Sequence, residues 1–222
     1  MTIKRGKFIT LEGPEGSGKS THLKMLEEYL KGKDFDVLTV RDPGGTKIGE
    51  RIRGILLDPA IKEMNILTEL FLFEASRAQL VHEKIREFLW EDKDKVVLSS
   101  RFTDATVVYQ GYGRFLNNGK IGMIKKLNDI VVKDSEPDLT ILLDIDVKEG
   151  LKRARGVNKD TPAGELDRIE SETIKFHRGV REGYLKLQKE EPERIKIIDS
   201  SKFVEEVHKE IRIHVNRLLN IK

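Results

Sequence analysis

The feature that most constrains this chain is a glycine-rich stretch at residues 11–21, with the sequence LEGPEGSGKST. It contains the pattern G-x-x-x-x-G-K-S, which runs from Gly13 to Ser20. The apolar run at 7–11 has the composition of a buried strand, and the leucines within 23–30 recur at helical spacing. A glycine-rich turn between a strand and a helix can aim several backbone N–H groups at one anion. The stretch therefore predicts a nucleotide-phosphate site.

Two side chains of this stretch have the chemistry that a phosphate site uses. Lys19 can place a mobile positive charge on the β- and γ-phosphates, and Ser20 can offer its hydroxyl to Mg²⁺. We therefore expect Mg²⁺ as the cofactor. The residues expected to bind the nucleotide form one continuous run: Gly13, Pro14, Glu15, Gly16, Ser17, Gly18, Lys19, Ser20 and Thr21.

Composition and charge exclude several classes of protein. A length of 222 residues suffices for one substantial core, so we expect a single domain over residues 1–222. Basic residues number 41 and acidic residues 38, a balance too even for a protein that binds nucleic acid or a membrane surface. Cysteine is absent, and the first residues lead directly into a strand without room for a signal peptide. We therefore expect a cytoplasmic protein.

Strand-like and helix-like segments alternate along the chain. Apolar runs predict further strands at residues 36–40, 95–99, 139–144 and, more weakly, 194–199. Apolar residues at helical spacing predict helices at 48–56, 66–90 and 204–218. This alternation is typical of an α/β protein. We expect a three-layer P-loop NTPase fold with a parallel sheet of about five strands flanked by helices.

In such a sheet, ligands bind at the carboxyl ends of the strands, where Gly13, Arg41, Ser100 and Asp144 are all expected. An arginine at a strand end beside a phosphate loop can hold a second phosphate through two parallel hydrogen bonds. Phosphoryl transfer mainly needs donor and acceptor in line, with positive charge around the transferred group. The chain is therefore predicted to be a kinase of a small phosphorylated acceptor.

An ordered set of motifs resembles the thymidylate kinase family over nearly the whole chain. The motifs are EGPEGSGKS at 12–20, RDPGGT at 41–46, FLFEASR at 71–77, RF at 101–102, VYQGYG at 108–113, PDLT at 137–140 and GELDRIE at 164–170. The resemblance implies phosphorylation of dTMP to dTDP with ATP and Mg²⁺, and it makes ATP the nucleotide on the glycine-rich stretch. It also implies a mobile lid at about 152–168, and a homodimer in which the helix at 66–90 is the expected interface element.

By the same resemblance, five residues hold the base and sugar of dTMP. Phe73 resembles the ring that stacks on thymine, and Arg77 the donor to its exocyclic oxygen. The two are four residues apart, about one helical turn, so they can reach the same pocket. Thr106, Tyr109 and Gln110 match the family's segment that contacts base and sugar, and Tyr109 resembles the residue that crowds the 2′ position.

Three charged residues are assigned to the acceptor's sugar and phosphate. Glu15 lies inside the phosphate loop, where an acidic side chain repels phosphates, and the resemblance explains it as a contact to the 3′-hydroxyl. Arg53 and Arg101 resemble acceptor-side arginines. Of the two, Arg101 is expected to grip the monophosphate and to take part in catalysis.

The segment at 152–168 resembles the lid, and its centre is polar with proline and glycine, as in a loop that can close. Family members with an acidic residue in the phosphate loop usually place a catalytic arginine in this lid. The candidates are Arg153, Arg155 and Arg168, which join Lys19 and Arg101 as the expected catalytic residues.

The chain departs from the family pattern after the third predicted strand. Ser100 stands where the family normally has an aspartate near Mg²⁺, and Asp104 is an acid that the pattern does not contain. A serine cannot supply the missing negative charge. Either Ser20, waters and the nucleotide phosphates hold the metal, or another acid such as Asp42 or Asp144 compensates.

Two alternatives stay open. One is a kinase of another nucleoside monophosphate, such as dUMP or UMP. The other is a P-loop module that binds nucleotide without turnover, for which Ser100 is the argument. A GTPase is disfavoured because NKDT at 158–161 lacks the final aspartate of a guanine-recognition motif. The five histidines lack metal-ligand spacing and are expected on helix surfaces.

Overall fold

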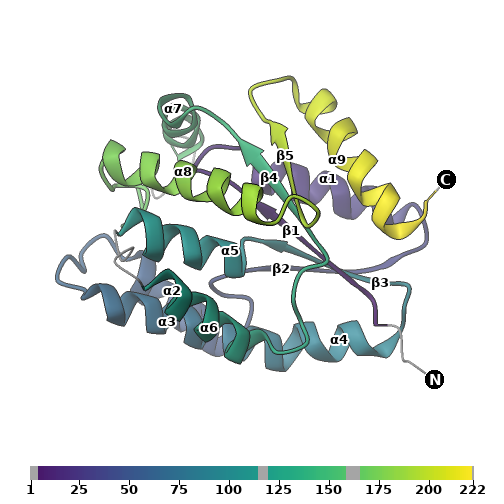
Figure 1. Ribbon diagram of the computed structural model, residues 1–222, viewed down its shortest axis with the longest axis horizontal. Helices are drawn as coiled ribbons and strands as arrows, with labels where there is room; N and C mark the ends of the chain where they lie inside the picture. Colours follow the sequence, from purple (N-terminus) through teal and green to yellow (C-terminus); the bar gives the residue numbers. More distant parts are fainter. Residues whose placement is uncertain (1–4, 115–119, 159–165, 222) are drawn as a thin grey trace.

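The computed structural model describes residues 5–114, 120–158 and 166–221. Its centre is a sheet of five parallel strands in the order β2-β3-β1-β4-β5 (Figure 1). The strands are β1 (Lys7–Glu12), β2 (Asp36–Arg41), β3 (Lys95–Ser100), β4 (Leu139–Asp144) and β5 (Ile195–Asp199). The prediction of an α/β protein with about five parallel strands is confirmed.

Helices cover both faces of the sheet (Figure 1). α1 (Lys19–Lys31) and α9 (Val204–Leu219) lie together against one face, whereas α3 (Ile66–Leu80) and α8 (Ile174–Glu190) pack against the other. Within the described ranges, none of the helices combines the length and apolar character that crossing a membrane requires. The remaining helical segments are α2 (Lys47–Leu57), η1 (Val81–Ile85), α4 (Arg86–Glu91), α5 (Thr103–Thr106), η2 (Val107–Gly113), α6 (Ile121–Val132) and α7 (Val147–Asn158).

The alternation of side chains along each strand explains the two packed layers. On β1, Ile9 and Leu11 belong to the cluster with α1 and α9, whereas Phe8 packs with α3, η1 and α4. On β4, Ile141 faces the first layer and Leu142 the second. Because successive side chains point to opposite faces, a strand covered on both sides must be apolar at nearly every position. This is why these strands form continuous apolar runs in the sequence.

The helix predicted at 66–90 is a helical run from α3 through η1 to α4, in which η1 is a π-helical turn. The sequence pattern did not reveal the π turn, nor did it lead to a prediction of α6 or α8. For α8 a signal was present, because Phe176, Val180, Tyr184 and Leu187 recur at helical spacing and are all buried.

The expectation that the histidines lie on helix surfaces is wrong for three of them. His22, His177 and His208 are buried. The rings of His22 and His208 stack between α1 and α9 with their centroids 6.2 Å apart. Burial lowers the pKa of all three imidazoles, to about 4 for His22, so they are neutral parts of the interior at neutral pH.

Asp104, the acid that the family pattern does not contain, forms a structural ion pair. Arg194 donates from Nη1 and Nη2 to its two carboxylate oxygens, at 2.8 Å each. The hydroxyl of Thr140 donates to the same carboxylate at 2.9 Å. These bonds join α5 to β4 and to the turn before β5.

Candidate active site

The glycine-rich stretch is a turn between β1 and α1, as the sequence predicts. Three of its glycines have positive φ angles: 143° at Gly13, 69° at Gly16 and 86° at Gly18. At Gly16 a Cβ atom would stand 1.9 Å from the carbonyl oxygen of Gly150, so only glycine fits this close approach. α1 begins directly after Gly18, at Lys19, which places its free N–H groups beside the turn.

Lys19 folds back over the loop that it follows. Its buried Nζ donates to the carbonyl oxygens of Gly13 and Pro14, at 3.0 and 2.7 Å, and to Ser17 Oγ at 3.2 Å. Burial, together with the positive charge of Arg101, lowers the pKa of Lys19 to about 7. The ammonium group therefore sits within the loop and can exchange weak carbonyl partners for the stronger charge of phosphates.

A cavity of about 720 Å³ opens beside the loop at the carboxyl ends of β1, β2 and β3. Gly16, Gly18 and residues 19–21 line it on the loop side, whereas Gly13, Pro14 and Ser17 lie behind Lys19 and do not. All eight residues predicted to bind the acceptor line the same cavity: Glu15, Arg53, Phe73, Arg77, Arg101, Thr106, Tyr109 and Gln110.

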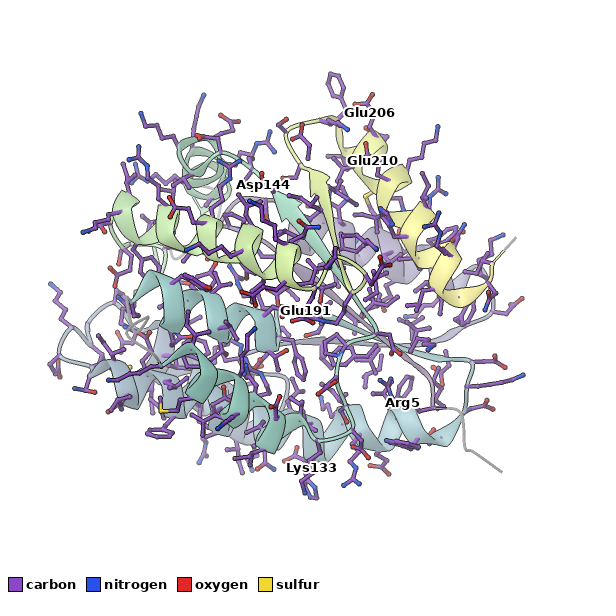
Figure 2. The ribbon with its side chains drawn as sticks, viewed as in Figure 1. Arg5, Lys133, Asp144, Glu191, Glu206 and Glu210 are labelled. Atoms are coloured by element: carbon purple, nitrogen blue, oxygen red, sulfur yellow. The ribbon has the colours of Figure 1, made fainter. Side chains whose placement is uncertain are left out.

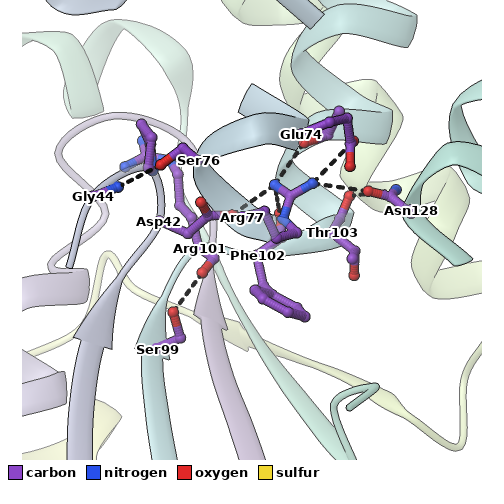
Figure 3. Close-up of polar contacts among 12 residues, drawn as sticks. Asp42, Gly44, Glu74, Ser76, Arg77, Ser99, Arg101, Phe102, Thr103 and Asn128 are labelled. Carbon is purple, nitrogen blue, oxygen red and sulfur yellow. Dashed lines mark hydrogen bonds and ion pairs between the residues drawn. The ribbon is translucent and has the colours of Figure 1, made fainter. Parts of the chain in front are cut away.

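Arg77 lies at the floor of this cavity, with every N–H group of its guanidinium engaged (Figure 3). Nε donates to Asp42 Oδ2 at 2.7 Å, and Nη1 donates to Glu74 and Asn128 at 3.1 and 2.8 Å. Nη2 donates to the carbonyl of Phe102 and to Thr106 Oγ1, at 3.0 and 2.7 Å. Since arginine has five N–H donors, a bond to a base oxygen requires one of these contacts to be exchanged.

Arg101 joins the phosphate loop to the side of the cavity that the residues predicted to bind the acceptor line. Its Nη2 donates to Glu15 Oε1 at 2.5 Å and to the hydroxyl of Tyr109 at 2.9 Å, and that hydroxyl lies 2.9 Å from the same Glu15 oxygen. Burial alone would raise the pKa of Glu15, but Arg101, Lys19 and these hydrogen bonds outweigh it and lower the pKa to about 2. Glu15 is therefore a carboxylate at neutral pH, held between two cations.

Comparison with known proteins identifies the family. The family model for thymidylate kinase matches residues 11–211. The thymidylate kinase of Halothermothrix orenii is 47% identical over 207 residues, covering 93% of this chain and 95% of that protein. The chain belongs to the thymidylate kinase family. The thymidylate kinase of Caldanaerobacter subterraneus is 46% identical, over 92% of both chains. A crystal structure of thymidylate kinase from Ehrlichia chaffeensis superposes with a TM-score of 0.74 at 30% identity, covering 96% and 99% of the two chains.

Membership confirms the predicted enzyme class, a phosphotransferase of the thymidylate kinase type, and its P-loop NTPase fold. The acceptor segment of the family has a consistent local structure here. Phe73 is half-buried on α3, one turn before Arg77. Thr106 ends α5, and Tyr109 and Gln110 lie on the π-helical segment η2 that follows it. Gln110 Nε2 donates to the buried Glu69 at 2.9 Å, which fixes the amide within the cavity wall.

The structure separates the three candidate arginines of the predicted lid. Arg153, on α7, lines the cavity and donates to the carbonyl of Ser200 at 2.9 Å. Arg155 is exposed and lines a different hollow, together with Lys148 and Lys152. Arg168 does not line the cavity: its Nε donates to the carbonyl of Leu56 at 2.8 Å, and its Nη2 pairs with Glu69 at 2.6 Å. The predicted lid begins inside α7, and its centre, at 159–165, is outside the described residues.

The residues suggested for Mg²⁺ fit that ion only around Ser20. The hydroxyl of Ser20 is exposed and lines the cavity, and Ser100 lies nearby on the same lining. Asp42 also lines the cavity, and although Oδ2 is paired with Arg77, Oδ1 is a buried acceptor without a partner among the described residues. In the part of the chain that the structure describes, no group of three or more acidic or histidine side chains could hold a metal by itself. A metal here would need the phosphates of a nucleotide as further ligands.

Two other strand-end residues have partners of their own. Asp144, at the end of β4 (Figure 2), accepts Nε and Nη2 of Arg181 at 2.7 Å each. Arg41 is exposed and paired with Glu50 at 2.8 Å. Neither lines the cavity, so neither is available there to hold a phosphate or a metal in this structure.

Sequence reasoning gave no role to several residues that complete the site. Asp167, Ile169 and Glu170 form one wall of the cavity, and Asp167 Oδ1 accepts the N–H groups of the other two at 2.8 Å each. The motif GELDRIE could have indicated this wall. Glu12 and Tyr184 lie just behind the cavity and bond to each other across 172 positions of sequence, which no local pattern reveals.

Proposed function

We propose that this chain transfers the γ-phosphoryl group of ATP to dTMP, with ADP and dTDP as products. One observation supports the proposal above all: the phosphate loop, the Phe73–Arg77 pair and Arg101 all line the same cavity. A phosphate oxygen of dTMP attacks the γ-phosphorus, and the bond from that phosphorus to the bridging oxygen of ADP breaks. The protein's part is to hold the two nucleotides in line and to place positive charge around the transferred group.

The positively charged side chains of the cavity have different roles in the transfer. Lys19 exchanges its bonds to the loop carbonyls for the β- and γ-phosphates of ATP. Arg101 holds the phosphate of dTMP, with Arg53 as a second cation on the acceptor side. Among the lid arginines we assign the catalytic role to Arg153, because of the three it alone lines the cavity. Arg168 instead anchors the end of the lid to α2 and α3.

The acceptor side selects the nucleoside. Phe73 stacks on the thymine ring, and Arg77 donates to its exocyclic oxygen after exchanging one of its five contacts. Tyr109 lies under the sugar, where its ring crowds the 2′ position and disfavours ribose. Glu15 is ionised beside it and accepts the 3′-hydroxyl. Gln110 and Thr106 complete this wall.

Mg²⁺, when bound with the phosphates of ATP, neutralises their charge during transfer. Ser20 would supply a hydroxyl ligand, and Asp42 Oδ1, which has no hydrogen-bond partner among the described residues, could contribute directly or through a water. Ser100 contributes no charge, so the nucleotide carries more of the metal binding than it would with an aspartate at this position.

We also propose that the chain works as a cytoplasmic homodimer. Large apolar side chains are exposed on α3 and on α2 and α6, each of which packs against α3; they are Ile48, Ile55, Leu67, Phe71, Met123 and Ile130. Exposed apolar groups gathered on neighbouring helices are typical of an interface. Analytical ultracentrifugation tests the dimer, and a Phe71→Asp variant that sediments like the unchanged chain would count against this face.

The absence of cysteine fits the proposed cytoplasmic location.

The experiment that tests the reaction measures ADP release with ATP and Mg²⁺ against dTMP, dUMP, UMP, dCMP and dAMP. A strong preference for dTMP supports the proposal. Turnover of another monophosphate would place the error in the pocket at Phe73, Arg77 and Tyr109. No turnover while ATP still binds would favour the second candidate, a P-loop module without catalysis, for which Ser100 on the cavity wall is the specific observation.

A further inference from the structure

Glu12 is a buried carboxylate that the proposed transfer does not use. It is the last residue of β1, it has no exposed surface, and it does not line the cavity. Both of its oxygens accept short hydrogen bonds from other parts of the chain. Oε1 accepts the backbone N–H of Phe102 at 2.7 Å, and Oε2 accepts the hydroxyl of Tyr184, on α8, at 2.6 Å.

The bond to Phe102 fixes an unusual turn at Arg101. Arg101 has a φ angle of 65°, in the left-handed region that arginine rarely adopts. Hydrogen bonds hold this residue on both sides: its N–H donates to the carbonyl of Leu11 at 3.1 Å, and its carbonyl accepts Ser99 Oγ at 2.7 Å (Figure 3). The N–H that follows it belongs to Phe102 and ends on Glu12. A strained conformation persists only where its surroundings determine it in this way.

The same turn sets the direction of the Arg101 side chain. From it the guanidinium reaches Glu15 and the hydroxyl of Tyr109, the contacts that place it in the cavity. Tyr184 supports this arrangement a second time, since its ring lies edge-on to that of Tyr109 with centroids 6.4 Å apart. Tyr184 therefore touches both the carboxylate that holds the turn and the ring against which Arg101 lies.

We propose that Glu12 and Tyr184 are positioning residues for Arg101, which hold its left-handed turn so that its guanidinium faces the phosphate of the acceptor. This inference rests on the proposed function of Arg101 as the grip on dTMP. The ionised carboxylate is the form that accepts both bonds, because Phe102 N–H and the Tyr184 hydroxyl are both donors.

Charged and polar groups on several elements around Glu12 act on its pKa. Burial and Asp104, on α5, raise its pKa to about 7, whereas the hydrogen bond from Tyr184, the charge of Arg101 and the N–H of Phe102 act in the opposite direction. Glu12 also interacts electrostatically with Lys19 on α1 and Arg77 on α3. Loss of the Tyr184 hydroxyl should therefore move the titration of Glu12 to higher pH.

The test compares Tyr184→Phe and Glu12→Gln with a matched control, Asp138→Asn. Asp138 also accepts a backbone N–H of β1, that of Phe8 at 2.8 Å, but at the opposite end of the strand. We expect Tyr184→Phe to raise KM for dTMP roughly fivefold, the effect of one lost hydrogen bond, with KM for ATP changed less than about twofold. The acidic limb of its kcat/KM profile for dTMP should move to higher pH. Asp138→Asn should leave both KM values and the pH profile unchanged.

Arg101→Lys separates this inference from the function on which it rests. If Arg101→Lys leaves KM for dTMP unchanged, Arg101 is not the grip, and both the role and the inference are overturned. If Arg101→Lys raises KM for dTMP but Tyr184→Phe changes neither that KM nor the pH profile, the inference alone is overturned. Tyr184→Phe decides this even if Glu12→Gln fails to fold. Equal changes in KM for ATP and dTMP would indicate a general structural role and contradict positioning.

Discussion

The guanidinium of Arg77 and the carboxylate of Asp42 form an ion pair at the floor of the cavity, with both side chains only 1% exposed. Nη2 lies 2.6 Å from Asp42 Oδ2, and Nε donates to the same oxygen at 2.7 Å. Burial raises the pKa of Asp42, and the neighbouring Arg77 offsets only part of this. The pair joins the end of β2 to α3, so the shape of the proposed acceptor pocket depends on it.

Asp42→Ala should destabilise the fold, because it leaves the guanidinium of Arg77 buried without its counter-ion. Breaking a buried pair by removing one partner costs about 3 kcal/mol or more. Denaturant unfolding measures this loss. The matched control is Arg41→Ala, which removes an ion pair to Glu50 with both side chains exposed, and which should cost less than about 1 kcal/mol. Equal losses in the two variants would show that burial does not govern the Arg77 pair.

Lys19→Met should abolish phosphoryl transfer while leaving the fold intact. Loss of a single charge at a transferring phosphate lowers kcat roughly 100- to 1,000-fold. The folded state is not expected to suffer, because burial already lowers the pKa of Lys19 to about 7 and methionine fills a similar volume without a charge. Steady-state rates and thermal unfolding measure the two effects. Lys24→Met, at an exposed position on the same helix, is the control, and near-normal turnover in Lys19→Met would refute the site.

The parts of the site that the sequence predicted are those encoded locally or in a motif. Predicting the loop from Gly13 to Ser20 required only a strand before it and a helix after it. Predicting that Phe73 and Arg77 share a pocket required only their spacing of one helical turn. The contacts that hold these residues join distant segments. The hydrogen bond from Arg77 to Asn128 joins residues 51 positions apart, and the spacing of apolar residues in the sequence does not indicate such a contact. The same holds for Arg168, whose contacts to Leu56 on α2 and Glu69 on α3 join segments about 100 positions apart in the sequence and are not indicated by any local pattern.

Ser100→Asp should raise the rate when Mg²⁺ is limiting. Ser100 lines the cavity at the end of β3, and Ser20, on the first turn of α1, lines the same cavity, so a carboxylate at position 100 adds a charged oxygen where the metal is proposed to bind. We expect the Mg²⁺ concentration at half-maximal rate to fall by roughly tenfold, about the effect of one charged ligand. Titration of activity with Mg²⁺ measures it. Ser100→Asn has the same shape without the charge and should change little; no difference between the two variants would mean that another group already fills the role.

Glu12→Gln should change stability in a way that depends on pH. The pKa of Glu12 is raised from 4.5 to about 7, mainly by burial and then by Asp104, so the folded state binds a proton that the unfolded chain has lost between these values. The stability contributed by this group is fully present below pH 4.5 and is lost as the pH rises through 7.

Since glutamine does not titrate, the free energy of unfolding of Glu12→Gln, relative to the unchanged chain, should be more favourable at pH 8 than at pH 4, by about 3 kcal/mol. Urea unfolding at several pH values measures it. Thr10→Val, which removes a buried hydroxyl from the same strand, is the uncharged control and should give one value at every pH. A Glu12→Gln difference that stays constant from pH 4 to pH 8 would show that the pKa of Glu12 is the same in the folded and the unfolded chain, near 4.5. Glu12 would then be a carboxylate at neutral pH, and an acidic limb of the activity profile near pH 7 would have to come from another group.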